Sequence, residues 1–208
     1  MEPGQPRQQV HPFERRRLTR RILGEAGGIP IGDRRVLEVG SGGGSELAWM
    51  VELGAEPSRL VGVDLLKDRV ASARSTYPGI DFRHGNAERL DLEDSSVDIV
   101  MTLTVFSSIF DERMMANIAA EIVRVLRPGG GLLWYDVRYD SNSNRNVHAM
   151  KAKRVRELFA PLHGRLQTVT LLPPLARRLG PVTGAAYPVL VGLPPLRSHL
   201  IGLLRKAA

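Results

Sequence analysis

The chain has 208 residues, 43% of them hydrophobic and none of them cysteine, which excludes a disulfide framework, a thiolate metal site and a cysteine nucleophile. Its length permits one substantial buried core, and because no Ser/Gly-rich or charged linker divides the sequence, we predict a single domain over residues 1–208. The formal net charge of +7 is unevenly placed: residues 1–35 hold eight basic and four acidic side chains, 36–137 hold nine and 16, and 138–208 hold twelve and two.

Residues 1–34 contain one amphipathic helical pattern. A helix is predicted over Phe13–Ala26, and Gly27-Gly28 end it. Its apolar residues share one side, and the basic residues elsewhere on it are Arg15, Arg16, Arg17, Arg20 and Arg21. The first ten residues are polar and lack the apolar core of a signal peptide, so we expect a cytoplasmic protein.

Residues 35–137 alternate between short apolar runs and amphipathic helical patterns. Strands are predicted over Arg35–Val39, Leu60–Asp64, Ile80–Arg83, Val97–Leu103 and Gly131–Val137. Helices are predicted over Gly44–Leu53, Lys67–Tyr77 and Asp111–Leu126. This alternation predicts an α/β fold with a parallel sheet covered by helices on both faces.

Residues 138–208 continue the pattern with a helix, two strands and an insert. The helix is predicted over Lys151–Phe159, and the strands over Leu166–Leu172 and His199–Arg205. The insert, 173–196, has no charge over 179–196, but its prolines would interrupt a helix and the run is shorter than the ~20 residues that span a bilayer. We predict a lid or substrate wall here and no transmembrane segment; association with a membrane surface is the alternative.

The loop after the first strand has the composition of a nucleotide-cofactor site. Glycines at 40, 42, 43 and 44 let the backbone pass close to a ligand, and the helix that follows offers unpaired N–H groups to an anionic group. Asp64 ends the second strand, where the acid of a βαβ unit binds the ribose hydroxyls. The spacing Glu38-x-Gly40-x-Gly42-x-Gly44 puts Ser45 where a dinucleotide motif has its third glycine, which opposes a nicotinamide oxidoreductase.

Four motifs, in this order, resemble those of the class I S-adenosylmethionine-dependent methyltransferases. Besides 38–44, Gly85–Leu90 is similar to the family's G-D-A-x-x-L loop, Ser96–Val100 to its F-D-x-V strand, and Leu126–Gly130 to its L-K-P-G-G turn. The resemblance covers about 36–137. It implies S-adenosylmethionine as cofactor and a Rossmann-like, doubly wound sheet of seven strands, mostly parallel with an antiparallel strand seven, in which 35–137 bind the cofactor and 138–208 form the acceptor side.

The resemblance also implies which residues bind the cofactor. Those expected at its methionine end are Glu38, Gly40, Ser41 and Gly42. Asp64 would accept both ribose hydroxyls, Leu65 would cover the adenine, and the N–H of Ala87 would meet a ring nitrogen. Asn86 stands where the family often has Asp on the adenine amino group, and its amide oxygen can accept the same bond. Thr102, near the end of the fourth strand, is also expected at the cofactor. The alternatives are a loop cap for Glu38 and a helix cap for Asp64.

The acceptor is expected over the carboxyl ends of strands four and five. The predicted substrate-binding residues are Phe106, Ser107, Tyr135 and Arg138. No Asn/Asp-Pro-Pro-aromatic sequence follows the fourth strand, so the nitrogen-methylating site of amino-purine and amide enzymes is missing and O-methylation is favoured. Asp136 and His148 are the candidate general bases, with His84 a weaker one, although a lone histidine is more often structural and a carboxylate acceptor needs no base. No metal is predicted.

A narrower resemblance concerns the segments after the fifth strand. Trp134–Tyr139, Asn142–Val147, Leu172–Leu179 and Pro195–His199 are similar to small bacterial methyltransferases found beside glycosyltransferases and cell-surface polysaccharide enzymes. The acceptor is therefore predicted to be a saccharide or another small molecule, and the protein a monomer or homodimer. Two alternatives stay open. The basic ends favour an RNA methyltransferase, which the lack of an RNA-binding module and of aromatic residues among the basic ones opposes; a non-catalytic S-adenosylmethionine-binding protein is also compatible.

Overall fold

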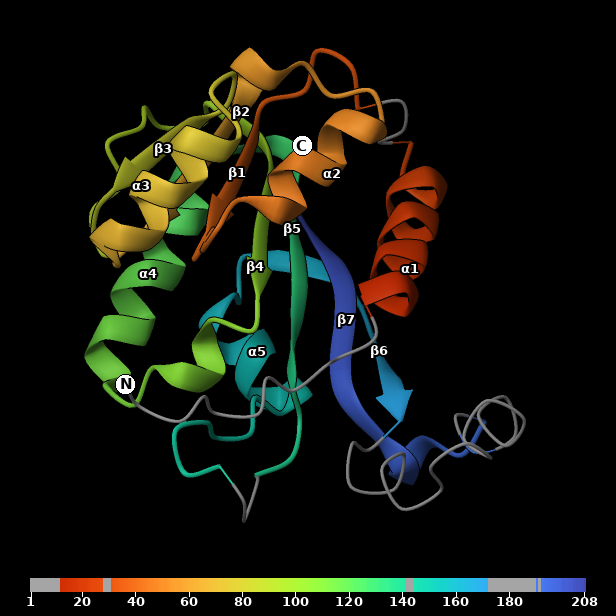
Figure 1. Ribbon diagram of the computed structural model, residues 1–208. Coiled ribbons are helices and arrows are strands. Elements are labelled where there is room, and N and C mark those ends of the chain that lie inside the picture. The colour runs from red at the N-terminus through yellow and green to blue at the C-terminus, as the bar shows by residue number, and fades with distance from the viewer. Residues whose placement is uncertain (1–11, 28–30, 141–143, 172–189, 191) are drawn as a thin grey trace, which may run out of the picture.

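The computed structural model describes residues 12–27, 31–140, 144–171, 190 and 192–208, which form one mixed sheet with helices on both faces (Figure 1). The strands are β1 (Val36–Val39), β2 (Leu60–Asp64), β3 (Asp81–His84), β4 (Val97–Leu103), β5 (Leu126–Val137), β6 (Leu162–Leu171) and β7 (Arg197–Lys206). The helices are α1 (Pro12–Glu25), α2 (Ser45–Glu52), α3 (Lys67–Thr76), α4 (Glu112–Val125) and α5 (Ala152–Leu158). Short 3₁₀ turns are η1 (Pro57–Arg59), η2 (Phe106–Ser108) and η4 (Pro194–Leu196).

The seven strands lie in the order β3-β2-β1-β4-β5-β7-β6. β1 to β5 are mutually parallel, and β7 is antiparallel to both of its neighbours, β5 and β6. This confirms the predicted doubly wound sheet with an antiparallel seventh strand. The chain winds outward in one direction from β1 to β3 and in the other from β4, so the order reverses between β1 and β4, the place where open α/β sheets bind ligands.

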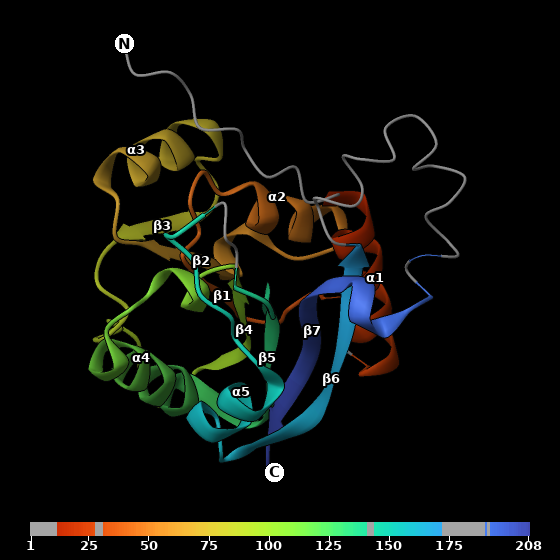
Figure 2. The ribbon, with the colours of Figure 1, turned by 90° about the horizontal axis from the view of Figure 1, so that it is seen from below.

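Helices cover the sheet in two layers, with α1, α2 and α3 on one face and α4 and α5 on the other (Figure 2). Leu47, Met50 and Phe82 are buried in the first layer, and Ile122 and Trp134 in the second. Asp111 begins α4 as its N-cap, accepting hydrogen bonds from the backbone N–H groups of Arg113 and Met114. No helix among the described residues is long and apolar enough to cross a membrane.

Most element boundaries agree with the prediction to within one or two residues, and two strands begin earlier than predicted. β5 begins at Leu126, which pairs with Val97, and Arg127–Gly130 then bulge out before Gly131 pairs with Ile99. The interrupting Pro128-Gly129 hid this start from the apolar pattern. β6 begins at Leu162 through a polar stretch that pairs with the end of β7. Of the predicted insert 173–196, only 190 and 192–196 are described, so the lid prediction lies mostly outside the described residues, as does Leu172.

Candidate functional site

The loop between β1 and α2 can be built only with glycines at two of its positions. Gly40 and Gly44 have φ angles of 74° and 81°, in the left-handed region. A Cβ on Gly40 would lie 2.5 Å from Cγ2 of Val105, and one on Gly44 would lie 2.4 Å from Cζ of Phe82. The N–H groups of Gly40 and Ser41 donate to the carbonyl of Val63 over 2.8 and 3.1 Å, which fixes the loop against β2.

Asp64 joins this loop to the segment that starts α3. Its Oδ2 accepts the N–H of Gly42 and its Oδ1 accepts the N–H of Leu66, each over 2.8 Å. The carboxylate is 7% exposed and borders a cavity. Asp64 therefore has a structural role in the turn, as its alternative interpretation predicted in part, and each oxygen keeps lone pairs that can accept a further hydrogen bond.

The cavity, of about 370 Å³, lies at the carboxyl ends of the parallel strands. Its walls on the β1, β2 and β3 side are Val39, Gly40, Val63, Asp64, Leu65, Leu66, Arg69, Gly85, Asn86 and Ala87. Its walls on the α4 side are Leu103, Thr104, Val105, Ser108, Ile109, Met114 and Ile118. Five of the predicted cofactor residues thus come together in one cavity. Glu38, Ser41 and Thr102 are buried outside its lining, and each has a side-chain oxygen without a hydrogen-bond partner among the described residues.

Asn86 shapes the wall at the predicted adenine side. Its Oδ1 accepts the N–H of Glu88 and its Nδ2 donates to Oε1 of the same residue, each over 2.9 Å. Glu88 also accepts from Asn117 of α4 over 2.8 Å, and hydrogen bonds from Asn117 and Asn86 lower the pKa of Glu88. Opposite, Nε2 of His84 is 3.2 Å from the carbonyl oxygen of Leu65. His84 therefore contacts the backbone just after β2, and Oδ1 of Asn86 keeps one lone pair for a ligand.

None of the predicted catalytic and substrate-binding residues lines this cavity. Asp136 is 1% exposed, and its carboxylate accepts from the N–H groups of Ser107, at 3.1 Å, and Val137, at 2.8 Å. Burial raises the pKa of Asp136. Phe106 packs in the core against Trp134, with ring centroids 5.1 Å apart. Asp136 and Phe106 thus hold the loop after β4, and their direct part in catalysis and substrate binding stays a prediction.

His148 and Arg138 also have local partners. The backbone N–H of His148 donates to the carbonyl of Ser107 over 2.9 Å, while its ring lies 5.1 Å from that of Phe110. Arg138 donates to the carbonyls of Pro194, at 2.9 Å, and Arg197, at 3.2 Å. These residues connect the segment after β5 to the loop after β4 and to the start of β7. Neither the His148 side chain nor the Arg138 side chain is among the residues that line the cavity.

Sequence reasoning missed several cavity residues on the α4 side, namely Ser108, Ile109, Met114 and Ile118. Met114 and Ile118 are four residues apart and so lie on one face of α4, but the same spacing also describes a helix face packed in a core. Thr104 carries a clearer mark: it is β-branched, has a φ of 58°, and its N–H donates to the carbonyl of Tyr135 over 2.7 Å. Such a strained backbone beside a cavity is typical of a functional site.

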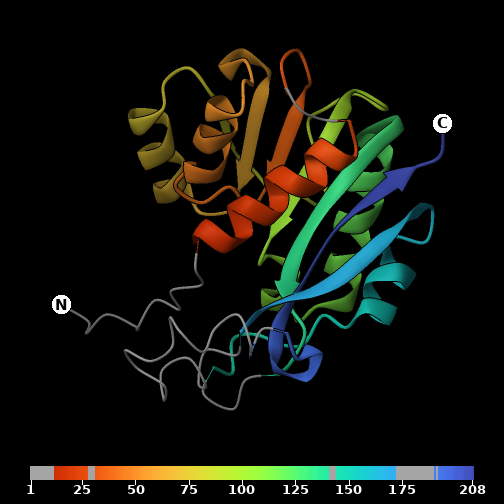
Figure 3. The same ribbon diagram turned by 90° about the vertical axis from the view of Figure 1, so that its right-hand side faces the viewer.

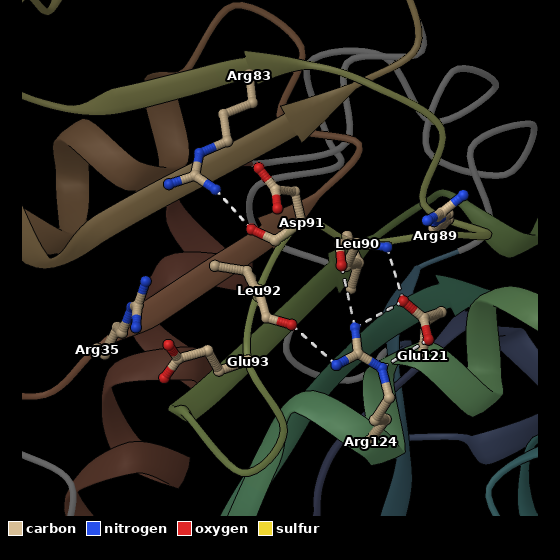
Figure 4. A pocket seen from close by; sticks show the side chains of 9 residues that line it. All are labelled: Arg35, Arg83, Arg89, Leu90, Asp91, Leu92, Glu93, Glu121 and Arg124. Atoms are coloured by element: carbon tan, nitrogen blue, oxygen red, sulfur yellow. Dashed lines mark hydrogen bonds and ion pairs between the residues drawn. The ribbon is translucent and has the colours of Figure 1, made fainter.

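A second cavity, of about 970 Å³, contains paired charges (Figure 4). Arg124 donates to Glu121 and to the carbonyls of Leu90 and Leu92, and Arg83 donates to the carbonyl of Asp91. These bonds hold the segment before β4 against α4 and β3. Because Arg124, Glu121 and Arg83 are engaged with one another or with backbone groups of this segment, we assign this cavity a structural role.

A buried polar cluster lies under α1, around Tyr135. The Tyr135 ring stacks on His199 with centroids 4.7 Å apart, and its hydroxyl is 3.2 Å from Oγ1 of Thr170. Nδ1 of His199 is 2.8 Å from Oγ of Ser198. Burial raises the pKa of Tyr135, and burial followed by the charge of Arg15 lowers the pKa of His199 to about 4. His199 is therefore neutral near pH 7.

Replacement of His199 by phenylalanine should make the free energy of unfolding less sensitive to acid. The folded pKa of His199 is below its ordinary value of 6.5, so between these values the unfolded chain binds a proton that the folded chain does not, and stability falls as the pH is lowered. This contribution is on the order of 2 kcal/mol between pH 7 and 5. Denaturant unfolding at both pH values measures it, with the exposed His163, replaced by glutamine, as control. Equal pH dependence in wild type and His199→Phe would contradict the assignment.

Comparisons with known proteins agree with this geometry. Residues 37–134 match the family described as "Methyltransferase domain". Among curated proteins, the chain is 39% identical over 100 residues to a probable S-adenosylmethionine-dependent methyltransferase of Mycolicibacterium smegmatis, covering 48% of this chain and 37% of that protein. It is 36% identical over 112 residues to phthiotriol/phenolphthiotriol dimycocerosates methyltransferase 1 of Mycobacterium ulcerans, covering 53% and 40%. The matched parts are thus less than half the length of these relatives.

Solved structures show the same fold at low sequence identity. A S-adenosylmethionine-dependent methyltransferase from Archaeoglobus fulgidus superimposes with a TM-score of 0.67 at 14% identity, covering 92% of this chain and 94% of that one. The [4+2]-cyclase SpnF superimposes with a TM-score of 0.66 at 19% identity, covering 92% and 81%. Among the described residues no group of three or more His, Asp or Glu side chains could hold a metal ion.

Proposed function

We propose that this chain, which belongs to the class I S-adenosylmethionine-dependent methyltransferases, transfers a methyl group to an oxygen atom of a small molecule or saccharide. The observation that carries the proposal is the cavity in which the glycine loop meets Asp64 at the point where the strand order reverses. S-adenosylmethionine supplies a methyl group already activated on a sulfonium. The protein therefore has mainly to bind, align the acceptor and exclude water.

The residues present fit this cofactor. Gly40 leaves the space beside Val105 that a side chain would fill, and Asp64 keeps lone pairs at the cavity rim. At the expected methionine end, Oε2 of Glu38 and Oγ of Ser41 are buried without partners among the described residues. Buried polar atoms are nearly always hydrogen-bonded, so unpaired ones beside a cofactor loop support a polar ligand there.

The walls beyond the cofactor favour an acceptor with an apolar part. Val105, Ile109, Met114 and Ile118 form the α4 side of the cavity and offer no charge. Relatives named for phthiotriol and phenolphthiotriol dimycocerosates support a small-molecule acceptor of this kind. O-methylation rests on the lack of a nitrogen-methylating motif after β4. A cytoplasmic location, for which the cysteine-free sequence is the support, is part of the same proposal.

The RNA alternative loses part of its basis in the structure. Of the five arginines on α1, Arg15 and Arg16 both pair with Glu46, at 2.7 and 3.1 Å, and so face the protein. Arg17, Arg20 and Arg21 are exposed. A face with three exposed arginines on one helix is a common solvated surface.

Cofactor identity is the first test of the proposal. Calorimetric titration should show that the chain binds S-adenosylmethionine and S-adenosylhomocysteine and, at the same concentrations, does not bind NAD, because the loop has Ser45 in place of the third dinucleotide glycine. Preference for NAD would reject the proposal. Acceptors are then screened by S-adenosylhomocysteine formation, starting with hydroxylated lipids and saccharides, and a cofactor-binding protein that turns over none of many acceptors would favour the non-catalytic alternative.

A further inference from the structure

Arg15, a residue of α1, contacts the first turn of α2, the helix that follows the glycine loop. The two helices are separated in the sequence by β1 and the glycine loop. Its Nη2 is 2.7 Å from Oε1 of Glu46, in the first turn of α2. The next residue, Arg16, donates to the carbonyl of Ser45 over 3.0 Å and to the same oxygen of Glu46. Figure 3 shows α1, in red, next to α2, in orange, on the same face of the sheet. Two arginines of α1 thus hold the segment that follows the glycine loop.

Arg15 also faces the ends of β1, β5 and β7. Its guanidinium carbon is 5.5 Å from the centroid of the Tyr135 ring, and its charge acts on both Glu38 and His199. The Arg15 side chain is only 16% exposed. A guanidinium withdrawn from water this far needs partners for all of its N–H groups.

Three polar atoms around this point have no partner among the described residues. They are Nε of Arg15, Oε2 of Glu38 and Nε2 of His199, and all three are buried. Leaving such groups unpaired costs free energy, so a native protein commonly has a bound group that pairs with them. Burial, and then the negative charge of Glu46, raise the pKa of Glu38, while the charge of Arg15 lowers it. A ligand with a cationic group near Glu38 would offset these effects by stabilising the ionised carboxylate.

The charges identify the kind of ligand. A simple anion would be repelled by Glu38 and Glu46, and a simple cation by Arg15 and Arg16. A group with one charge of each sign matches an acid and a guanidinium that lie near enough for their charges to interact and that each have a buried, unpaired polar atom among the described residues. An α-amino acid group, with an ammonium and a carboxylate on one carbon, has this form, and the methionine end of the proposed cofactor is such a group.

We propose that Arg15 binds the carboxylate of the cofactor's methionine moiety, opposite Glu38, so that α1 forms part of the cofactor site. The inference rests on the proposed function and adds to it a residue outside the 37–134 methyltransferase match. Arginine suits the role because its planar fork can pair with Glu46 and a ligand carboxylate together.

The test compares two ligands that share the adenosine and the sulfur but differ in the arm that carries the amino-acid group. S-adenosylhomocysteine carries it, whereas 5′-methylthioadenosine has the same adenosine and thioether without it. Arg15→Met, which keeps an apolar stem against Tyr135, should weaken S-adenosylhomocysteine binding about 10- to 100-fold in calorimetry of the full chain and leave methylthioadenosine within about twofold. Arg15→Lys, which keeps the charge and loses the fork, should give an intermediate loss for S-adenosylhomocysteine alone.

Arg20→Ala, an exposed arginine of the same helix, is the matched control and should change neither affinity. Equal weakening of both ligands by Arg15→Met would overturn the inference, because it would mean that Arg15 only supports the fold of the site. Unchanged affinity for S-adenosylhomocysteine would overturn it as well, and would leave a bridging water as the partner of these atoms. If the wild-type chain bound neither ligand, the proposed function itself would fail, a result distinct from both.

Discussion

Replacement of Gly40 by alanine should reduce the affinity for S-adenosylmethionine by roughly 2–4 kcal/mol, a loss of 30-fold or more. The φ of 74° at this position costs an alanine about 1–2 kcal/mol, and its Cβ would lie 2.5 Å from Cγ2 of Val105. Val105 is stiff at χ1 because it is β-branched, and it lines the cavity, so relief of the clash displaces either the loop or the cavity wall. Calorimetry and thermal unfolding of the same sample separate the loss of affinity from loss of fold.

Gly43 supplies the control within the same five-residue loop. A Cβ on Gly43 would meet nothing within 4 Å, and its φ is not in the left-handed region. Gly43→Ala should therefore leave both affinity and stability within about 0.5 kcal/mol of wild type. Equal losses of affinity in Gly40→Ala and Gly43→Ala would contradict this explanation. They would show that the glycine at 40 is not needed for the close approach of the loop backbone to Val105.

Replacement of Asp64 by alanine should weaken S-adenosylmethionine binding by ~1.5–3 kcal/mol, the scale of charge-assisted hydrogen bonds at a partly buried site. It also leaves the N–H groups of Gly42 and Leu66 without their acceptor, so the melting temperature should fall as well. Titration well below the melting transition keeps the two effects apart.

Asp64→Asn and Asp68→Ala refine this test. Asparagine keeps one oxygen for the turn and loses the charge, so it should preserve more stability than alanine while still weakening the ribose contact. Asp68, exposed in the first turn of α3, should be neutral for binding. A folded Asp64→Ala variant with wild-type affinity would show that Asp64 serves only the backbone turn.

The β1, β2 and β3 side of the cavity was predictable because its signals are local in the sequence. Gly40 and Gly44 are required by their own backbone angles, and Asp64 follows directly from the end of an apolar run. The order of strands and helices was predictable from the spacing of apolar residues and from the Gly and Pro residues at the turns. What the pattern could not supply was the start of β5, where the Pro-Gly bulge breaks the apolar run but leaves Leu126 paired with Val97.

The surroundings of the predicted acceptor residues were less predictable because they depend on which way each side chain points. Along β5, Tyr135 faces α1 and Asp136 faces the loop after β4, so a shift of one residue exchanges the two environments. The position of a residue near the end of a strand therefore did not show whether its side chain lines the cavity or is buried behind another element. Arg15 lies in no motif, and the motif that ends at His199 did not indicate their proximity; the sheet order that places β7 beside β5 brings them to the same point.

The fold by itself does not decide the reaction. The [4+2]-cyclase SpnF shares this fold with the present chain at 19% identity, and its name states a different chemistry. The decision therefore rests on the cofactor and acceptor measurements above.

The position of α1 also constrains when the site can form. This first helix of the described chain is seated on Tyr135 of β5 through Arg15, and Arg205 of β7 donates to the carbonyl of Ala26 just after it. This contact is thus completed by β7, which is synthesised some 180 residues after the helix itself. During synthesis the glycine loop and Asp64 are present before β7 exists, whereas the bond from Arg205 to Ala26 has to wait for it, so we expect the end of α1 to be fixed on the sheet only after the rest of the site has been made.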